Sequence, residues 1–203
     1  MRIQCLLVIA LLSLPAFGQE TWGLVKSDGN VTVYTKLLPG KPYKSFKAVG
    51  VVQSTPIQLL EILENVGRYN QWFAYSHSVR LLDTKKNQQY VYMQTNFPWP
   101  FRNEDMVYVI SVSDSDDGEI KLLLEGYPAF IPLVDGVERM RGANGYILLQ
   151  PEHEHTIVTY VMHIELSGHI LPWLANKNIQ NMPFRTLNNL IAIAEACQPM
   201  PGC

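Results

Sequence analysis

The feature that most constrains the fold is a proline-rich corner between two stretches with strand character. Residues 96–107 have the sequence Asn-Phe-Pro-Trp-Pro-Phe-Arg-Asn-Glu-Asp-Met-Val. Each proline removes a backbone donor and pushes the residue before it towards extended geometry, so this segment cannot lie inside a sheet. The flanking residues 90–95 and 105–112 are rich in β-branched and aromatic side chains, as strands are. The sequence therefore predicts a sheet that bends at a rigid aromatic corner, followed by the charged residues Arg102, Glu104 and Asp105.

A targeting segment precedes the folded part of the chain. Arg2 supplies a positive start, residues 3–14 are almost wholly apolar, and residues 16–18 fit a small-x-small cleavage site. The apolar run is shorter than the ~20 residues of a membrane-spanning helix. We expect a signal peptide at 1–18, a single mature domain at 19–203, and export to the periplasm, with a retained anchor as the alternative. The net charge of -2 lacks the basic footprint of a nucleic-acid-binding protein, and we expect a monomer.

Two cysteines, Cys197 and Cys203, remain after removal of the signal peptide. An even number of cysteines in an oxidising compartment permits a disulfide. The bridge would close a very short loop and so would stabilise the chain little. A disulfide and two free thiols both stay open at this point.

The rest of the chain predicts one α+β domain. Thr55, Pro56 and Gln58 form a capping-box start for a first helix that ends near Gly67. A long final helix opens near Pro172 and is kinked or restarted at Pro183. Between them the sequence predicts an antiparallel meander, with strands near 78–83, 89–96, 105–113, 119–126, 137–150 and 156–166.

No strong catalytic or metal-binding motif is present, and we expect no cofactor. His153 and His155 share a strand face and could bind a metal, although solvated side chains are the simpler interpretation. His163 and Glu165 could form an acid–base pair or a structural hydrogen bond. Arg139 and Arg141 could anchor a carboxylate or phosphate inside a cavity, or be solvated; either could also pair with the acidic residues behind the corner.

Strand alternation places one set of apolar side chains on the inner face of the predicted sheet. Methionine adapts to irregular apolar partners, so this face suits a lipid pocket and a plain core equally well. The set comprises Val91, Met93, Met106, Tyr108 and Ile110.

The sequence resembles the START family of lipid-binding domains, within the wider helix-grip superfamily. The resemblance rests on residues 90–108, which contain the corner, and is supported by residues 69–74, 145–151 and 168–174. It implies a curved antiparallel sheet around a long C-terminal helix, with an apolar tunnel between them. It also implies a gate, for which the long apolar connector 127–136 is the matching segment.

Two departures from the family pattern limit what the resemblance implies about the ligand. Glu104 stands where the family usually has an arginine, so any salt bridge built on that arginine is absent or rewired. The positions of the aromatic cage of choline-lipid binders match Met93, Met106 and Ala143, which argues against a phosphatidylcholine specialist.

The leading hypothesis is non-catalytic binding and transfer of a lipid or sterol-like molecule, with transient contact to a membrane surface. The alternatives are a helix-grip hydrolase or cyclase that uses His163 and Glu165, and a structural module whose oily loop docks a partner protein. The ligand-binding residues predicted on the leading hypothesis are Val91, Met93, Met106, Tyr108, Ile110, Arg139 and Arg141, with Phe130, Leu133 and Trp173 at the gate.

Overall fold

The computed structural model describes residues 21–114 and 117–197. The predicted signal peptide lies outside the described residues, and so does Cys203, on which the choice between a disulfide and two free thiols depends. No helix within the two described ranges combines the length and apolar character needed to span a membrane.

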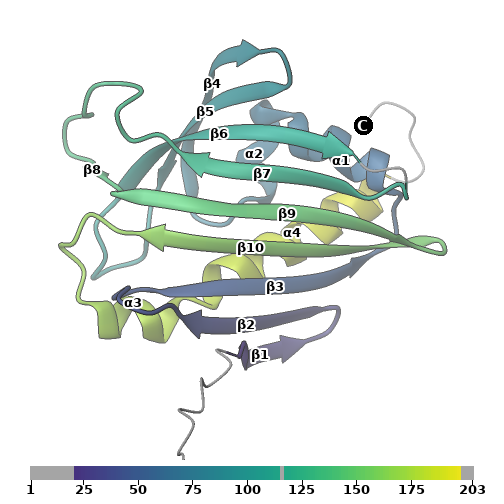
Figure 1. The fold of residues 1–203 in the computed structure, drawn as a ribbon, viewed down its shortest axis with the longest axis horizontal. Helices are drawn as coiled ribbons and strands as arrows, with labels where there is room; N and C mark the ends of the chain where they lie inside the picture. The colour runs from purple at the N-terminus through teal and green to yellow at the C-terminus, as the bar shows by residue number, and fades with distance from the viewer. Residues whose placement is uncertain (1–20, 115–116, 198–203) are drawn as a thin grey trace, which may run out of the picture.

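The fold is a strongly curved antiparallel sheet with the helices on its concave face (Figure 1). Its strand order is β1-β2-β3-β10-β9-β7-β6-β5-β4, so two meanders join where β3 pairs with β10. The strands are β1 Gly23–Asp28, β2 Val31–Leu37, β3 Lys44–Val52, β4 Ser76–Lys85, β5 Gln88–Thr95, β6 Glu104–Asp114, β7 Ile120–Gly126, β8 Glu138–Arg139, β9 Gly142–Glu152 and β10 His155–Glu165.

The strand predicted at 137–150 is in fact two elements. The short β8 pairs in parallel with the start of β6, whereas β9 lies antiparallel between β7 and β10. The break arises because Arg139 is drawn to the start of β6, where its side chain pairs with Asp105. A single continuous strand would not bring that arginine to this place.

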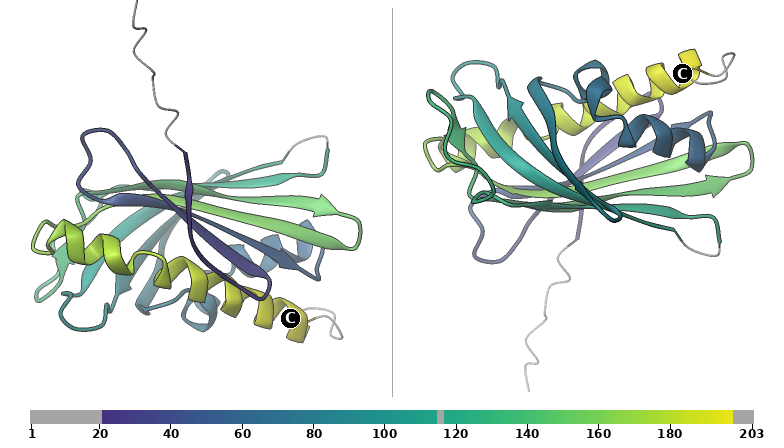
Figure 2. Two further views of the ribbon diagram at one scale, coloured as in Figure 1. Left: turned by 90° about the horizontal axis from the view of Figure 1, so that it is seen from below. Right: turned by 90° about the horizontal axis from the view of Figure 1, so that it is seen from above.

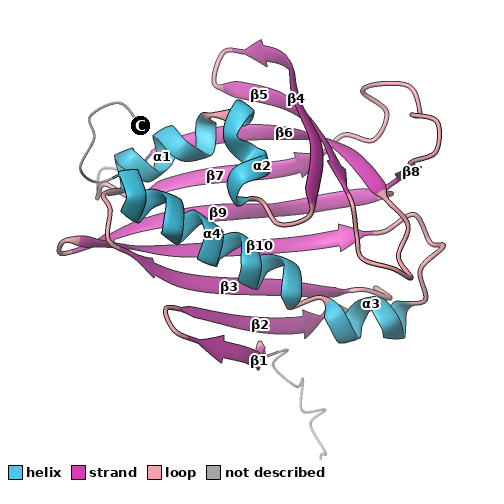
Figure 3. Cartoon of the chain, turned by 180° about the vertical axis from the view of Figure 1, so that it is seen from behind, coloured by secondary structure: helices cyan, strands magenta, loops and turns pink. Residues whose placement is uncertain are grey.

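The helices lie together on the concave side of the sheet, and Figures 2 and 3 show the long C-terminal helix running across it. The predicted capping box is present, since Thr55 and Gln58 exchange hydrogen bonds at the start of the first helix. The predicted restart near Pro183 is a break between two helices, and Pro183 lies in the first turn of the second, where it costs no helical hydrogen bond. The helices are α1 Pro56–Glu64, the 3-10 turn η1 Val66–Arg68, α2 Tyr69–Trp72, α3 Pro172–Asn178 and α4 Asn181–Cys197.

The core lies between the concave face and these helices. Gly50 of β3 faces Leu187 and Ile191 of α4, so the backbone of the strand and the apolar stripe of the helix approach closely. The even-numbered residues of β6 join this core, whereas Asp105 and the odd-numbered residues after it point to the convex face. The predicted architecture, a curved sheet wrapped around the C-terminal helix, is confirmed.

Candidate functional site

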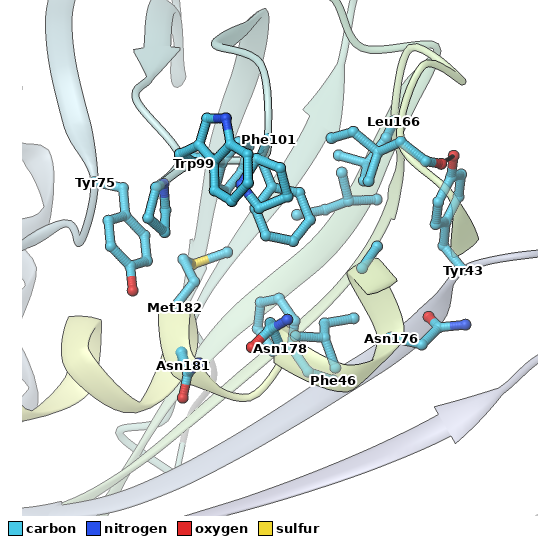
Figure 4. A pocket seen from close by; sticks show the side chains of 17 residues that line it. Tyr43, Phe46, Tyr75, Trp99, Phe101, Leu166, Asn176, Asn178, Asn181 and Met182 are labelled. Atoms are coloured by element: carbon cyan, nitrogen blue, oxygen red, sulfur yellow. Dashed lines mark hydrogen bonds between the residues drawn. The ribbon is translucent and has the colours of Figure 1, made fainter. Parts of the chain in front are cut away.

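An apolar cavity of about 210 Å³, here called the outer cavity, opens at one end of the sheet (Figure 4). It lies between the loop at residues 97–101, the adjoining ends of β3 and β10, and the junction of α3 with α4. Among the seventeen described residues that line it, none is Asp, Glu, Lys, Arg or His. These residues are Tyr43, Phe46, Tyr75, Phe97, Pro98, Trp99, Pro100, Phe101, Ile164, Leu166, Ile170, Ala175, Asn176, Asn178, Ile179, Asn181 and Met182.

The proline-rich corner forms the mouth of the outer cavity. Ring contacts hold it: the centroids of Phe97 and Phe101 are 6.2 Å apart, and Tyr75 lies 6.2 Å from Phe97. A turn closes the loop where the Phe101 N–H donates to the Pro98 carbonyl at 3.1 Å. Trp99, joined to Pro100 by a cis peptide bond, is 91% exposed although it borders the cavity. The mouth therefore presents a large apolar ring to the surroundings.

Neutral polar groups occupy the opposite wall of the outer cavity. The Tyr43 hydroxyl donates to the Ile170 carbonyl at 3.0 Å, and Asn176 bonds the chain on both sides of Tyr43. The side-chain amide of Asn178 donates to the Leu174 carbonyl at 3.1 Å, and Figure 4 shows this side chain beside Phe46. Burial raises the pKa of Tyr43, which keeps its phenol neutral. The wall can orient a ligand by hydrogen bonds but supplies no charge.

A second and much smaller cavity of about 20 Å³, here called the inner cavity, lies deeper in the core. Phe46 of the outer cavity and Tyr160 of the inner cavity are in edge-to-face contact, with centroids 5.1 Å apart. Burial raises the pKa values of the phenols that line the inner cavity, so these groups too are neutral. The inner cavity is lined by Leu63, Tyr69, Trp72, Phe73, Val91, Met93, Tyr108, Ile110, Leu122, Leu124, Ile147, Tyr160 and Met162.

Glu104 is a buried carboxyl near this end of the molecule, with no exposed surface. It accepts hydrogen bonds from the backbone N–H of Ser167 at 3.2 Å and from the Ser167 hydroxyl at 2.8 Å. Burial raises the pKa of Glu104 to about 7, and the hydrogen bonds from Ser167 oppose that rise. The Glu104 carboxyl thus holds the segment after β10 by hydrogen bonds.

The structure brings four of the predicted ligand-binding residues together around the inner cavity: Val91, Met93, Tyr108 and Ile110. Met106 lies on the same face and is fully buried, but it packs against Gly126 and lines neither cavity. The alternation of apolar side chains along β5 and β6 was sufficient to predict the four residues that line the inner cavity.

Arg139 is not available to a ligand, which corrects its assignment to the binding site and confirms the alternative that it pairs with an acidic residue behind the corner. Its side chain is 7% exposed and pairs with Asp105, with 2.5 Å between Nε and the carboxylate. It also donates to the carbonyls of Pro128, Ile131 and Pro132. The guanidinium therefore satisfies a buried carboxylate and the backbone of the loop at 127–137, on the convex side of the sheet.

The residues predicted to form a gate do not line the outer cavity, so this prediction is wrong. Phe130 stacks on Tyr90, 4.7 Å away, and Tyr90 points to the convex face because it alternates with the core residue Val91. Leu133 and Trp173 are largely exposed and line neither cavity. The loop at 127–137 thus covers the outside of its own sheet, and the loop at 97–101 occupies the mouth. This also weakens the hypothesis of an oily loop held free for a protein partner.

Arg141, His163 and Glu165 also lie away from the two cavities. Arg141 is exposed, and its guanidinium lies against Gly168. His163 contacts the Ser45 hydroxyl at 3.2 Å on the convex face, since it alternates with the core residue Met162. Glu165 pairs with Lys41, which lowers the pKa of its carboxyl. The acid–base pair is therefore not directed at a bound molecule.

His153 sits at a hairpin turn with a φ of 56°. Over residues 21–114 and 117–197, no three His, Cys, Asp or Glu side chains gather in an arrangement that could hold a metal ion.

Sequence reasoning missed most of the outer cavity. The corner was identified as a fold marker, but nothing in its residues indicated which face of the sheet it would cover. Tyr43, Phe46 and Asn178 come from the two ends of the domain, and only the pairing of β3 with β10 brings them together. The alternation of Ile164 with His163 was the one signal that could have placed the end of β10 in the cavity wall.

Comparison with known proteins identifies relatives over most of the chain. The START domain family model matches residues 7–197. A STAR-related lipid transfer protein of Xanthomonas axonopodis has a solved structure with a TM-score of 0.81, 30% identity, and coverage of 86% of this chain and 98% of that one. The phosphatidylcholine transfer protein of Mus musculus is 23% identical over 93% of this chain and 89% of its own length. The Streptomyces aromatase/cyclase ZhuI, at 14% identity and a TM-score of 0.53 over 76% of this chain and 94% of that one, shares the fold alone.

Proposed function

The chain belongs to the START domain family, and from this premise we propose that it binds one lipid-type molecule non-covalently in the outer cavity and transfers it. The observation that carries the proposal is the cavity itself: an apolar space between sheet and helices, with a few neutral hydrogen-bonding groups on one wall. Such a combination of apolar lining and sparse polar groups is typical of small-molecule sites. Lipid transfer proteins among the relatives support the same function at the level of the family.

The size of the outer cavity bears on how a ligand is held. Its 210 Å³ is below the roughly 300–1,000 Å³ of sites for drug-sized ligands. A short chain or compact ring system fits without change, and a larger lipid requires the mouth to open. The loop at 97–101 is suited to this movement because ring contacts hold it, with no strand pairing across it.

We further propose that the mouth touches a membrane surface when the ligand is exchanged. Trp99, Leu171 and Trp173 are 91%, 59% and 65% exposed, and all three belong to the loops and helix at the end where the outer cavity opens. Tryptophan is favoured where an apolar region meets water, as at the membrane interface. Export across the inner membrane, expected from residues 1–18, would place this exchange in the periplasm.

The enzymatic alternative has no specific observation in its favour. Its candidate residues, His163 and Glu165, lie on the convex face, and the described lining of both cavities holds no carboxylate, imidazole or amine. Similarity in fold to an aromatase/cyclase does not supply those groups.

Lipid extraction and native mass spectrometry of the purified mature protein test the proposal. We expect a co-purifying hydrophobic molecule, or stoichiometric uptake of one from vesicles. A protein that is empty as isolated and takes up nothing from mixed-lipid vesicles would overturn the proposal.

A further inference from the structure

The charged groups near the cavities all have partners or face solvent. Arg139 is bonded to Asp105, Glu165 pairs with Lys41, and Glu104 accepts hydrogen bonds from Ser167. The described residues that line the two cavities add no charge to these. A buried ion without a counter-charge costs several kcal/mol, so the cavities disfavour an ionised group on the ligand.

One residue of the inner-cavity lining, Trp72, carries a hydrogen-bond donor that no described residue satisfies. Trp72 is 2% exposed, and its indole Nε1 has no hydrogen-bond partner among the described residues. Tyr69 and Phe73 fix the ring by edge contacts, with centroids at 4.9 and 5.6 Å. An unsatisfied buried donor costs about 1–3 kcal/mol, so an acceptor atom beside Trp72 would be bound favourably.

The surroundings of Trp72 indicate what kind of acceptor fits. The inner cavity is about 20 Å³, which is enough for one oxygen atom with its hydrogen and too little for a headgroup. The hydroxyl of Tyr69 is committed to the Leu63 carbonyl at 2.6 Å. The hydroxyl of Tyr108 reaches only the thioether of Met140, at 3.9 Å, which is a weak acceptor. An oxygen placed beside Trp72 could accept a hydrogen bond from its indole N–H.

An aromatic contact links the linings of the outer and inner cavities. Phe46 lines the outer cavity, Tyr160 lines the inner one, and their rings meet edge to face at 5.1 Å. A shift of this pair would join the two spaces and lengthen the site beyond the 210 Å³ of the outer cavity.

Resting on the lipid-binding function proposed above, we infer that the ligand is an uncharged lipid with an alcohol or ketone oxygen at its buried end, and that the indole N–H of Trp72 donates to this oxygen. Trp72 then acts as a specificity-determining residue. It selects a neutral oxygen-bearing lipid over a hydrocarbon, and the absence of charge in the described lining selects against fatty acids and cationic amphiphiles.

The experiment compares four probes of equal chain length: decane, decanol, decanoate and decyltrimethylammonium. Each displaces the uncharged fluorophore Nile red from the protein, below the micelle concentration of the probe. We expect decanol to bind most tightly, decane next, and the two ions most weakly. Trp72→Phe keeps the ring and removes the N–H, and should lower the affinity for decanol about tenfold, equivalent to about 1.4 kcal/mol, while leaving that for decane unchanged. Trp22→Phe, at a tryptophan that contacts Lys47 outside the lining of both cavities, is the matched control and should change neither.

The possible outcomes separate the two proposals. If decanoate or decyltrimethylammonium binds as well as decanol, or if Trp72→Phe leaves the ratio of decanol to decane affinity unchanged, the inference is overturned while lipid binding stands. If no probe binds, the inference fails, and lipid extraction with native mass spectrometry then decides the lipid-binding proposal by itself. Should Trp72→Phe not fold, the indole N–H proton resonance of Trp72 in the parent protein decides: a downfield shift with decanol but not with decane supports the inference, and equal responses refute it.

Discussion

Two proline-containing loops meet the start of β6 from opposite sides of the sheet, and they are held in different ways. The loop at 97–101 covers the concave side, where ring contacts and an exposed pair between Arg102 and Glu138 are its main ties. The loop at 127–137 covers the convex side, where the buried Arg139 binds its carbonyls and Asp105 at once. An apolar loop beside the sheet is therefore not necessarily able to open. A loop that a buried ion pair bonds to the sheet, such as 127–137, is fixed, whereas a loop held by ring contacts, such as 97–101, can move.

The strongest test of this contrast is removal of the convex anchor. Arg139→Met leaves Asp105, 1% exposed, without its counter-charge and leaves loop carbonyls without donors. We expect a loss of about 3–5 kcal/mol in the free energy of unfolding, measured with urea. The matched change on the concave side, Arg102→Met, removes a pair whose arginine is 65% exposed and should cost less than about 1 kcal/mol. Equal costs for the two variants would contradict the distinction between the loops.

The second test concerns Glu104, the neighbour of Asp105 on the other face. Its pKa is raised to about 7 from 4.5, so the folded state holds the proton more tightly than the unfolded chain does. Stability from this group is fully present below pH 4.5 and is lost as the pH rises through 7, by about 3 kcal/mol in total. Glu104→Gln keeps an acceptor for Ser167 and should be more stable than the parent above pH 7 and equal to it below pH 4.5.

Urea unfolding across this pH range measures the effect of Glu104→Gln, with Glu125→Gln on the exposed face of β7 as control. The prediction fails if the unfolding free energy of the parent protein rises between pH 5 and 7 and that of Glu104→Gln rises equally. In that case the pKa of Glu104 is not raised in the folded protein.

The third test addresses the proposed contact of the mouth with membranes. Trp99→Ala removes an exposed ring and should change the unfolding free energy by less than about 0.5 kcal/mol. It should slow ligand exchange with vesicles about fivefold, equivalent to about 1 kcal/mol. Leu133→Ala, on the convex loop and 75% exposed, should leave the exchange rate unchanged. If the two variants slow exchange equally, the mouth has no special role.

The smallest effect is expected at Glu165. Pairing with Lys41 lowers the pKa of this carboxyl, so it contributes stability above its unfolded pKa that is lost as the pH falls. The pair is partly exposed, and Glu165→Gln should cost less than about 1 kcal/mol at neutral pH, a cost that disappears as the pH falls below 4.5 through the lowered pKa. Ligand affinity, measured by the same fluorophore displacement, should not change. A marked loss of affinity would return this residue to the binding site.

Local chemistry in the sequence predicted most of the elements. The capping box at Thr55, the strand alternation of β5 and β6, and the turn residues between strands act over a few positions, so they can be recognised without the fold. The pairing of Arg139 with an acidic residue behind the corner was one of the alternatives that the sequence offered. The position of the loop at 127–137 could not be predicted from it, because the sequence does not specify on which face of the sheet Arg139 meets Asp105. The role of Trp72 was hidden for a similar reason: it was identified as an aromatic residue that packs a helix pair on the sheet, and only the packed core shows its N–H without a described partner.

The pairing of β3 with β10 also has a consequence for folding. These strands come from distant parts of the chain, and the walls of the outer cavity include residues from both, such as Phe46 and Ile164. Contacts between distant parts of a chain form slowly because a large loop must be closed first. We therefore expect the binding site to form late in folding, and a chain that ends before β10 should have no outer cavity in which to hold a ligand.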